Sequence, residues 1–254
     1  MSDVTPGALS AAHDANWIAT FGAIADVLPR GVRRAWKTVT VVASGTPVMN
    51  KVIVTDPSPD PAELDEALAL VRAHRLRFEA YVREDHPSAV AAVAATGLQR
   101  EWTMPCMACP LPVATPVPVE LELRRADAAT LPLFREVAGC SFEMPPAIAE
   151  AVFPPEMLAV PEIRAFVGLV DGRPVACAAS FQTGQVIGIY TVGTVPDARG
   201  RGYGAAVTAA AMRQTGAPAS LAILQASAMG RPVYERMGFR TVHAMAVFEE
   251  GGGA

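Results

Sequence analysis

The sequence predicts an α/β (α+β) fold in which helices flank a mixed central sheet, in two similar halves along the chain. Three observations carry this prediction. Stretches with the two-residue alternation of strands alternate with helical patterns. A glycine-rich turn joins a long apolar strand to an alanine-rich helix in the second half. Each half also ends with a strand, a helix, a glycine before a large apolar residue (Gly97-Leu98, Gly238-Phe239) and a last strand, which indicates an internal repeat.

Residue patterns in the first half of the sequence predict three helices and four strands. Trp17, Phe21, Ile24 and Leu28 share one face of a helix, which indicates a first amphipathic helix. The later elements are, in order, strands at 38–44 and 48–55, a helix at 61–74, a strand at 77–82, a helix ending at Gly97 and a strand at 99–111.

A proline-rich segment at 109–120 cannot form a helix and suits an extended linker, so we expect domains at 1–115 and 119–254. After it, 119–124 alternates as a half-buried strand, and Asp127 suits the N-cap of a helix that ends at Gly139. The remaining elements are irregular helical pieces at 139–162, strands at 165–170, 175–182 and 185–195, a helix at 203–214 closed by Gly216, a strand at 220–226, a helix from Pro232 to Gly238 and a strand at 240–250.

Composition excludes several classes of protein. The chain has 254 residues, 51% of them hydrophobic, and a net charge of −4, which is too mild for a nucleic-acid-binding protein. Asp3, Asp14 and Asp26 argue against a signal peptide. The longest uncharged run, Pro174–Pro196, is broken by a polar turn and suits two strands, so we expect no membrane association. Four cysteines are few for a disulfide scaffold, and this favours the cytoplasm.

The turn between the long strand and the helix could hold phosphate. Gly200, Gly202 and Gly204 alternate with Arg199 and Arg201. Consecutive amides at a helix start can hold an anion, and arginines add charge. On these residues alone, a tight turn with two solvated arginines is an equally good interpretation.

Two nucleotide-binding motifs fit this turn poorly. A P-loop needs Gly-Lys-Ser/Thr, whereas this chain has Gly204-Ala205-Ala206. A dinucleotide fingerprint formally fits, but it needs an acid about 20 residues later, and no Asp or Glu occurs between Asp197 and Glu235. We therefore reject both motifs, and a nicotinamide-dependent oxidoreductase stays only a distant third hypothesis, which the absence of any NAD(P) binding would close.

The same turn resembles the acyl-CoA signature of the GCN5-related N-acetyltransferases (GNAT), which is Arg/Gln-x-x-Gly-x-Gly/Ala. Here it consists of Arg199, Gly202 and Gly204, with Pro196 shortly before. The segment 231–242 also resembles the family's closing segment, a tyrosine-bearing helix followed by Gly-Phe and a strand. The resemblance covers 119–249 and implies a GNAT fold, with two GNAT-like domains in tandem.

The resemblance also implies site residues. Pantetheine would pair with the long strand at Val192, Gly193 and Thr194, and the Val192 amide would polarise the thioester carbonyl. Tyr234 would be the general acid for the CoA thiolate. Thr194 is better explained as a plain β-branched strand residue, and Ser227 replaces an asparagine common in the family. The implied cofactor-binding residues are Val192, Gly193, Thr194, Arg199, Gly200, Arg201, Gly202, Tyr203, Gly204, Ala205 and Ser227.

No general base can be identified. Glu143, Glu150 and Glu156 lie in the segment that would line the acceptor side, but surface charge explains each of them better. We expect His243 to face outward. The pair Cys106-x-x-Cys109 lacks the further ligands of a zinc site, so we expect apolar filler and no metal.

The first half has acids where the second has glycines. Asp56, Asp60, Glu63, Asp65 and Glu66 would repel a pyrophosphate, so we expect this half to bind no CoA. The leading hypothesis is an acetyl-CoA-dependent N-acetyltransferase that acts on a primary amine of unknown identity, as a monomer or homodimer. The alternative is a non-catalytic acyl-CoA-binding sensor or interaction module.

Overall fold

The computed structural model of the chain describes residues 5–44, 46, 49–75, 77–112, 115–213 and 218–251. Contacts divide the chain into two compact units. Unit 1 consists of Met1–Trp17 and Met107–Arg240, and unit 2 consists of Ile18–Cys106 and Thr241–Ala254. Helix α1 (Pro6–Val27) and strand β5 (Gln99–Pro110) therefore contribute residues to both units.

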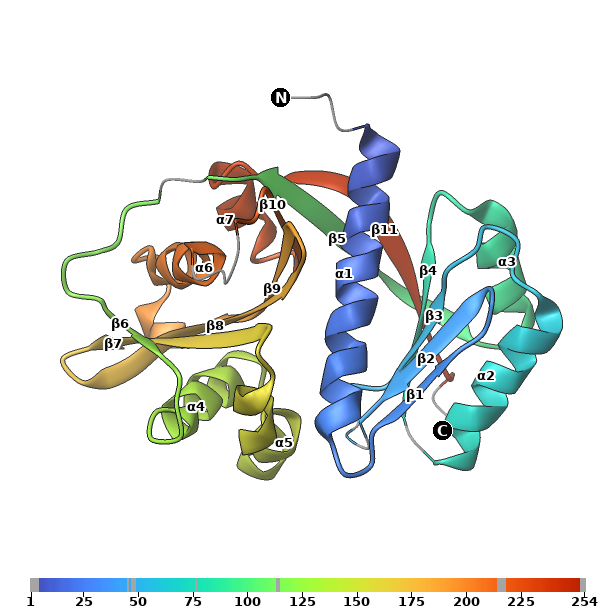
Figure 1. The fold of residues 1–254 in the computed structure, drawn as a ribbon, viewed down its shortest axis with the longest axis horizontal. Helices are drawn as coiled ribbons and strands as arrows, with labels where there is room; N and C mark the ends of the chain where they lie inside the picture. Colours follow the sequence, from blue (N-terminus) through green and yellow to red (C-terminus); the bar gives the residue numbers. More distant parts are fainter. Residues whose placement is uncertain are drawn as a thin grey trace. The chain divides into compact units, whose positions relative to one another are not determined.

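Unit 2 contains a sheet with the strand order β1-β2-β3-β4-β11-β5 (Figure 1). Strands β1, β2 and β3 are successively antiparallel, β3 and β4 are parallel, and β4 is antiparallel to β11. Besides α1 and β5, its elements are β1 (Val32–Ala35), β2 (Val39–Ala43), β3 (Lys51–Val54), α2 (Pro61–Ala73), β4 (Glu79–Arg83), α3 (Pro87–Ala95) and β11 (Arg240–Glu249).

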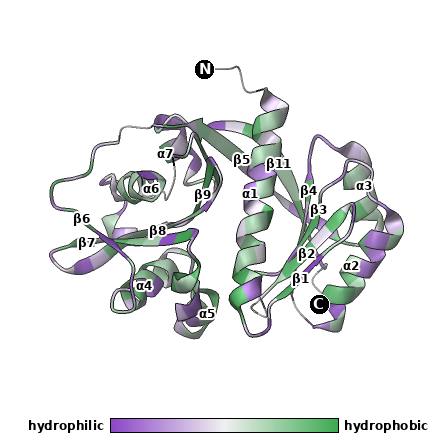
Figure 2. Cartoon of the chain, viewed as in Figure 1, coloured by the Kyte–Doolittle hydropathy of each residue, from purple (hydrophilic) through white to green (hydrophobic). Residues whose placement is uncertain are grey.

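The core of unit 2 lies on the face of this sheet that α2 and α3 cover. Alternate strand residues such as Val52, Val54 and Val82 pack there against Leu68 of α2 and Val93 of α3. The edge strand β1 is mostly exposed and hydrophilic, whereas β2 is fully buried and largely hydrophobic (Figure 2). Strand pleating therefore explains which side chains enter the core.

The opposite face of the same strands carries a buried polar group. Lys51 Nζ lies 3.3 Å from a Glu79 carboxylate oxygen and 3.0 Å from the Tyr81 hydroxyl. The ring of Phe21 on α1 lies 4.9 Å from the same ammonium. Burial lowers the pKa of Lys51, and the Glu79 carboxylate opposes that shift.

Unit 1 contains a sheet with the strand order β5-β10-β9-β8-β7-β6. Strands β6 to β9 are successively antiparallel, and β9 and β10 are parallel. Helices α4 and α6 cover opposite faces of it (Figure 1). Besides α1 and β5, its elements are β6 (Glu122–Arg125), α4 (Leu131–Ser141), α5 (Pro146–Val152), η1 (Pro155–Ala159), β7 (Ile163–Val170), β8 (Arg173–Thr183), β9 (Val186–Thr194), η2 (Pro196–Ala198), α6 (Tyr203–Arg213), β10 (Leu221–Gln225) and α7 (Arg231–Arg236).

The first part of α1 is anchored to the hairpin of β8 and β9. The fully buried Asn16 amide donates to Thr183 Oγ1 at 2.8 Å and to Phe181 O at 3.2 Å. The Tyr190 hydroxyl donates to Asn16 Oδ1 at 2.8 Å. A side chain at Gly188 would collide with these groups, since its Cβ would lie 2.1 Å from Asn16 Oδ1.

Most predicted helices and strands are confirmed, and the differences have physical reasons. Strand β1 was not predicted because its four residues include Arg33 and Arg34 and show no apolar alternation. Helix α4 begins at Leu131, later than Asp127, although the Asp127 carboxylate accepts hydrogen bonds from the two amides before the helix. Gly216, predicted to close α6, lies outside the described residues.

The prediction that His243 faces outward was wrong, because its side chain is only 8% exposed. The division at 1–115 and 119–254 stays a prediction about folding domains. Contacts group the chain differently, because they assign Met1–Trp17 to unit 1 and Thr241–Ala254 to unit 2.

Candidate active site

Strand β9 leaves its parallel neighbour part-way along its length. The register of β10 with β9 runs from Leu221 opposite Val186 to Leu224 opposite Ile189. Strand β9 continues to Thr194, so Tyr190–Thr194 extend beyond the paired part of β10. Backbone groups on that side of β9 are thereby left for another partner.

Beyond this divergence β9 contains a β-bulge. Tyr190 is opposite Ala179 on β8, and Gly193 is opposite Cys177, so one strand has an extra residue. Thr191 and Val192 have no partner in this register, and Thr191 has a left-handed φ of 52°. A non-glycine residue at such a φ is uncommon and often marks a functional position.

At Gly193 the backbone of β9 lies close to the end of α4. A Cβ there would lie 2.6 Å from Ser141 Oγ and 3.2 Å from Cys177 Sγ, so no side chain fits without displacing α4. Among the described residues, the buried Ser141 hydroxyl has no hydrogen-bond partner.

The turn after β9 presents free backbone amides. Gly200 and Gly202 have left-handed φ values of 79° and 83°. A Cβ at Gly200 would point into open space, and one at Gly202 would lie 3.8 Å from Pro118 Cγ. Among the described residues, the amides from Gly200 to Ala205 donate no backbone hydrogen bond, and the first in α6 that does is Ala206 N, to Gly202 O at 3.0 Å. Such a row of amides at a helix start is suited to an anion.

Charged side chains around this turn are partly committed to other groups. Arg199 Nε donates to Thr194 O at 3.2 Å, which ties the turn to the end of β9. The Tyr203 hydroxyl donates to Glu120 at 2.9 Å. Hydrogen bonds from its own amide and from Tyr203 lower the pKa of Glu120, and Arg201 lowers it further. Arg201 is exposed and can contact a ligand in the turn.

Tyr234 is a buried phenol on α7. Its ring packs edge-on against Phe239 with centroids 5.9 Å apart, and its side chain is 7% exposed. Among the described residues its hydroxyl has no hydrogen-bond partner. Burial raises the pKa of Tyr234, and the nearby Cys177 raises it further, so the phenol keeps its proton at neutral pH.

Ser227 and Thr194, both predicted to contact the cofactor, make local contacts within the protein. The exposed Ser227 Oγ accepts from Gly230 N at 3.0 Å, just before α7. Thr194 Oγ1 would lie 3.2 Å from a Cβ at Gly204, so Thr194 packs against the first turn of α6.

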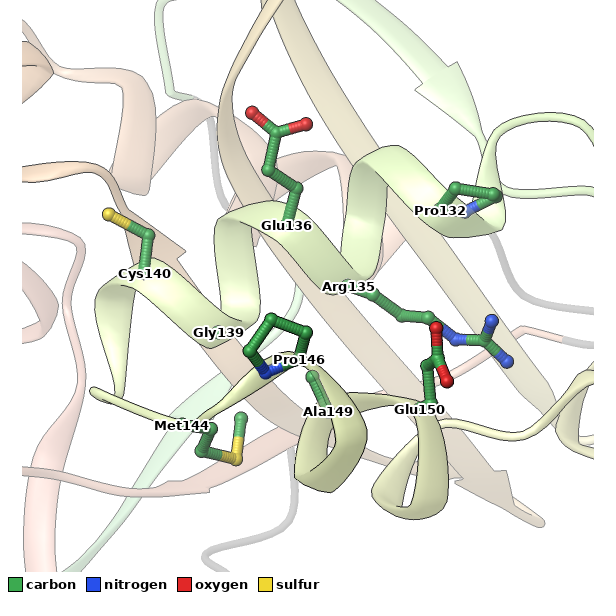
Figure 3. A pocket seen from close by; sticks show the side chains of 9 residues that line it. All are labelled: Pro132, Arg135, Glu136, Gly139, Cys140, Met144, Pro146, Ala149 and Glu150. Carbon is green, nitrogen blue, oxygen red and sulfur yellow. The ribbon is translucent and has the colours of Figure 1, made fainter.

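One of the three acids of the variable segment, Glu150, lines a pocket beside α4. A pocket of about 400 Å³ lies between α4 and α5, and Glu150 lines it together with Arg135 and Glu136 (Figure 3). Arg135 and Glu136 lie on the side of α4 opposite its buried residues Leu131 and Phe134, which pack toward the sheet, and Glu150 of α5 faces that same outer side across the pocket. Glu150 therefore does not face the divergence of β9 and β10.

Sequence patterns did not identify Cys177 and Ser141. Both side chains adjoin Gly193, but only the bulge register and the end of α4 bring them there. A glycine inside an apolar strand was the one available signal, because it often marks a bulge or a close backbone approach.

The sequence matches a model of a known protein family over part of its length. A family model described as the acetyltransferase (GNAT) domain matches residues 161–241, from β7 through α7 to the start of β11. No curated protein matches the chain. The match confirms the predicted GNAT resemblance and supports an acyltransferase.

Solved structures similar to this chain include several of the same fold. A GCN5-related N-acetyltransferase from Kribbella flavida has a TM-score of 0.71 and 22% identity, covering 94% of this chain and 96% of that one. One from Sphaerobacter thermophilus has a TM-score of 0.63 and 18% identity, covering 85% and 78%. A tandem GNAT protein from the clavulanic acid biosynthesis pathway has a TM-score of 0.61 and 16% identity, covering 89% and 86%. These similarities confirm the fold class.

Within the described part of the chain, no helix has the length and apolar character needed to span a membrane.

Proposed function

We propose that unit 1 transfers an acetyl group from acetyl-CoA directly to a primary amine. One observation carries the proposal: β9 leaves β10, bulges at Thr191–Val192 and runs into a left-handed glycine turn whose amides donate no backbone hydrogen bond within the described part of the chain. A strand edge followed by an anion cradle suits a ligand with an extended amide-bearing arm and a pyrophosphate, which is the shape of CoA.

The proposed cofactor contacts follow from this arrangement. The pantetheine arm pairs with β9 at Val192, Gly193 and Thr194, as an added strand would. The pyrophosphate lies on the amides of Gly200–Ala205 at the start of α6, with exposed Arg201 beside it. Arg199 holds the turn to β9 through Thr194 O, and Ser227 contributes at most a short hydroxyl contact.

The proposed reaction is direct attack. The neutral amine nitrogen attacks the thioester carbonyl carbon, a C–N bond forms and the C–S bond breaks. The Val192 amide donates a hydrogen bond to the carbonyl oxygen as negative charge develops there. The departing sulfur takes a proton from Tyr234, and the amine nitrogen loses one to water.

Tyr234 suits the role of proton donor because it is neutral and its hydroxyl is not engaged by the described residues. A donor must carry its proton at the working pH, and the raised pKa of Tyr234 ensures this. None of Glu143, Glu150 and Glu156 is needed as a base, because a neutral amine is already a nucleophile.

Residues 1–115, most of which belong to unit 2, are proposed to be a degenerate second copy that binds no CoA. They repeat the path of strand, helix, parallel strand, helix and strand in β3, α2, β4, α3 and β5. We further propose a cytoplasmic protein that acts on an amine acceptor without nucleic acid or membrane, as a monomer or homodimer.

A non-catalytic acyl-CoA-binding module is the second candidate. The observation that favours it is the engagement of Ser227 in the start of α7, together with the position of Glu150 away from the bulge. A panel of primary amines, with thiol detection of released CoA, separates the two. An enzyme releases CoA with at least one amine above the hydrolysis background, and a binding module binds acetyl-CoA but releases none.

A further inference from the structure

The bulge of β9 contains a contact that neither the family match nor the motif explains. Cys177 lies on β8 opposite the bulge and is fully buried. Its thiol donates to Thr191 O, with sulfur and oxygen 3.4 Å apart. Thr191 is the residue with the left-handed φ of 52°, so the thiol holds the carbonyl of the residue that forms the bulge.

The thiol is a hydrogen donor under all ordinary conditions. Burial raises the pKa of Cys177 to about 12, and hydrogen bonding from the Gly193 amide only partly opposes this shift. The side chain is therefore S–H and not thiolate at neutral pH, which a bond to a carbonyl oxygen requires. A protonated, buried thiol is also a poor nucleophile, so covalent chemistry at this sulfur is not part of the account.

Because a peptide group is planar, the contact to Thr191 O also sets the direction of the Val192 N–H. Thr191 O and Val192 N–H belong to the same peptide group, and the one cis peptide bond among the described residues is Leu111–Pro112. In a planar trans peptide, C=O and N–H point in opposite directions. A carbonyl held toward Cys177 on β8 therefore turns the Val192 N–H away from β8. On that side the paired part of β10 has already ended at Leu224.

We propose that Cys177 is a positioning residue, whose thiol fixes the Thr191–Val192 peptide so that the Val192 amide faces the reacting carbonyl. This rests on the proposed function, in which the Val192 amide stabilises the developing oxyanion. A hydrogen bond to Thr191 O also polarises the same peptide group and strengthens its N–H as a donor. Gly193 completes the device, since any side chain there would push against the thiol and Ser141 Oγ.

Three substitutions separate orientation from packing. Cys177→Ser keeps a donor for Thr191 O, Cys177→Val keeps an apolar side chain of similar size without a donor, and Cys177→Ala removes both. If the thiol positions the amide, kcat falls about ten-fold or more in the valine and alanine variants and is largely retained in the serine variant. The calorimetric affinity for acetyl-CoA stays within about two-fold in all three, because most of the binding contacts lie in the turn before α6.

Two other patterns of kcat among the three variants would overturn the proposal. If Cys177→Val keeps the wild-type kcat while Cys177→Ala loses it, the thiol only fills space. If all three variants lose kcat and affinity in parallel, the substitutions damage the fold instead of the amide.

A second measurement does not depend on turnover. In ¹³C spectra of the labelled chain, the Thr191 carbonyl resonance should move upfield in the valine and alanine variants, because a hydrogen-bond donor is lost, and stay near its wild-type position in the serine variant. No shift in any variant would refute the contact itself. Absence of acetyl-CoA turnover in the wild type would instead refute the proposed function, and this carbonyl shift would still decide whether the thiol fixes the peptide.

Discussion

The chain contains two turns that lead from a strand into a helix and on to a parallel strand, and they treat the helix start in opposite ways. In unit 2, Asp60 caps α2 by accepting from Ala62 N at 2.9 Å, and Pro61 has no amide hydrogen to offer. Leu64 N donates to Asp60 O at 3.1 Å. In unit 1, the amides from Gly200 to Ala205 donate no backbone hydrogen bond among the described residues.

The difference shows that topology alone does not make an anion site. Both helices have positive partial charge at their first turn. In α2 the chain neutralises it with carboxylates, because Asp60 caps the helix and Glu63 accepts from Thr38 N at 2.7 Å. In α6 left-handed glycines hold the first amides open, so an external anion can take the place that Asp60 occupies in unit 2.

The largest effect is expected from closing the open turn. Gly202→Glu places a carboxylate and a strained φ at the centre of the cradle, so acetyl-CoA binding in a calorimetric titration should disappear, a loss of at least about 100-fold. Gly97→Glu is the matched control, because Gly97 has a similar φ of 87° and room for a side chain, but lies in unit 2. Equal losses in both variants would mean that strain, and not the cradle, controls binding.

The second largest effect concerns α7 and α3, the helices that follow the parallel strands β10 and β4. Helix α7 carries the buried phenol of Tyr234, whereas α3 is built from small and apolar residues. Tyr234→Phe keeps the ring packed on Phe239 but removes the proton donor, so kcat should fall about 100-fold while the affinity for acetyl-CoA is unchanged. A variant with full turnover would remove Tyr234 from the reaction.

The buried thiol beside the bulge of β9 should also affect the pH dependence of stability. The corresponding strand of unit 2, β3, contains no such thiol. The pKa of Cys177 is raised from 9.0 to about 12 in the folded chain. Between these values the unfolded thiol ionises and the folded one does not, so the folded state binds more protons and the free energy of unfolding falls as pH rises. The expected slope from this group is about 1.4 kcal/mol per pH unit above pH 9.

Urea unfolding at pH 8, 9 and 10 measures this slope, and Cys177→Val is the control that lacks the thiol. The wild type should lose clearly more stability than the variant between pH 9 and 10, and only slightly more between pH 8 and 9, because a thiol of pKa 9.0 is half ionised at pH 9. Parallel curves throughout would show that the thiol is not buried as described.

The smallest effect is expected from opening the closed turn. Asp60→Ala removes the cap of α2 and should lower the free energy of unfolding by about 1 kcal/mol, without creating acetyl-CoA binding in unit 2. Asp65→Ala removes the same charge from an exposed position further along α2 and should change stability by less than half as much. Equal changes would indicate that charge, and not the capping hydrogen bond, matters there.

Local patterns were sufficient to predict most of the fold. Strand alternation, glycine stops and proline starts placed β7, β8, β9, α6 and α7 within a few residues, because each depends on its own sequence. The edge strand β1 was missed because Arg33 and Arg34 give no apolar signal, and only its pairing with β2 makes it a strand. The burial of His243 was missed because strand alternation does not reveal when both faces of a sheet are covered.

The candidate site was predicted only where it is contiguous in sequence. The glycine turn and the tyrosine helix are short motifs, so they were identified together with the strand that precedes the turn. The bulge at Thr191, the thiol of Cys177 and the hydroxyl of Ser141 were not, since strand register and helix position bring them together. Contacts between distant segments leave no periodic trace in the sequence.

The stoichiometry of acetyl-CoA on the whole chain tests the comparison of the two turns most directly. Isothermal titration of the wild-type chain should give one site per chain, because the turn before α6 leaves its amides open among the described residues, whereas the start of α2 is capped by Asp60. Two sites per chain would show that the capped start of α2 also accepts the cofactor. No binding at all would show that the glycine turn is a structural turn, and the proposed acetyl transfer would fail with it.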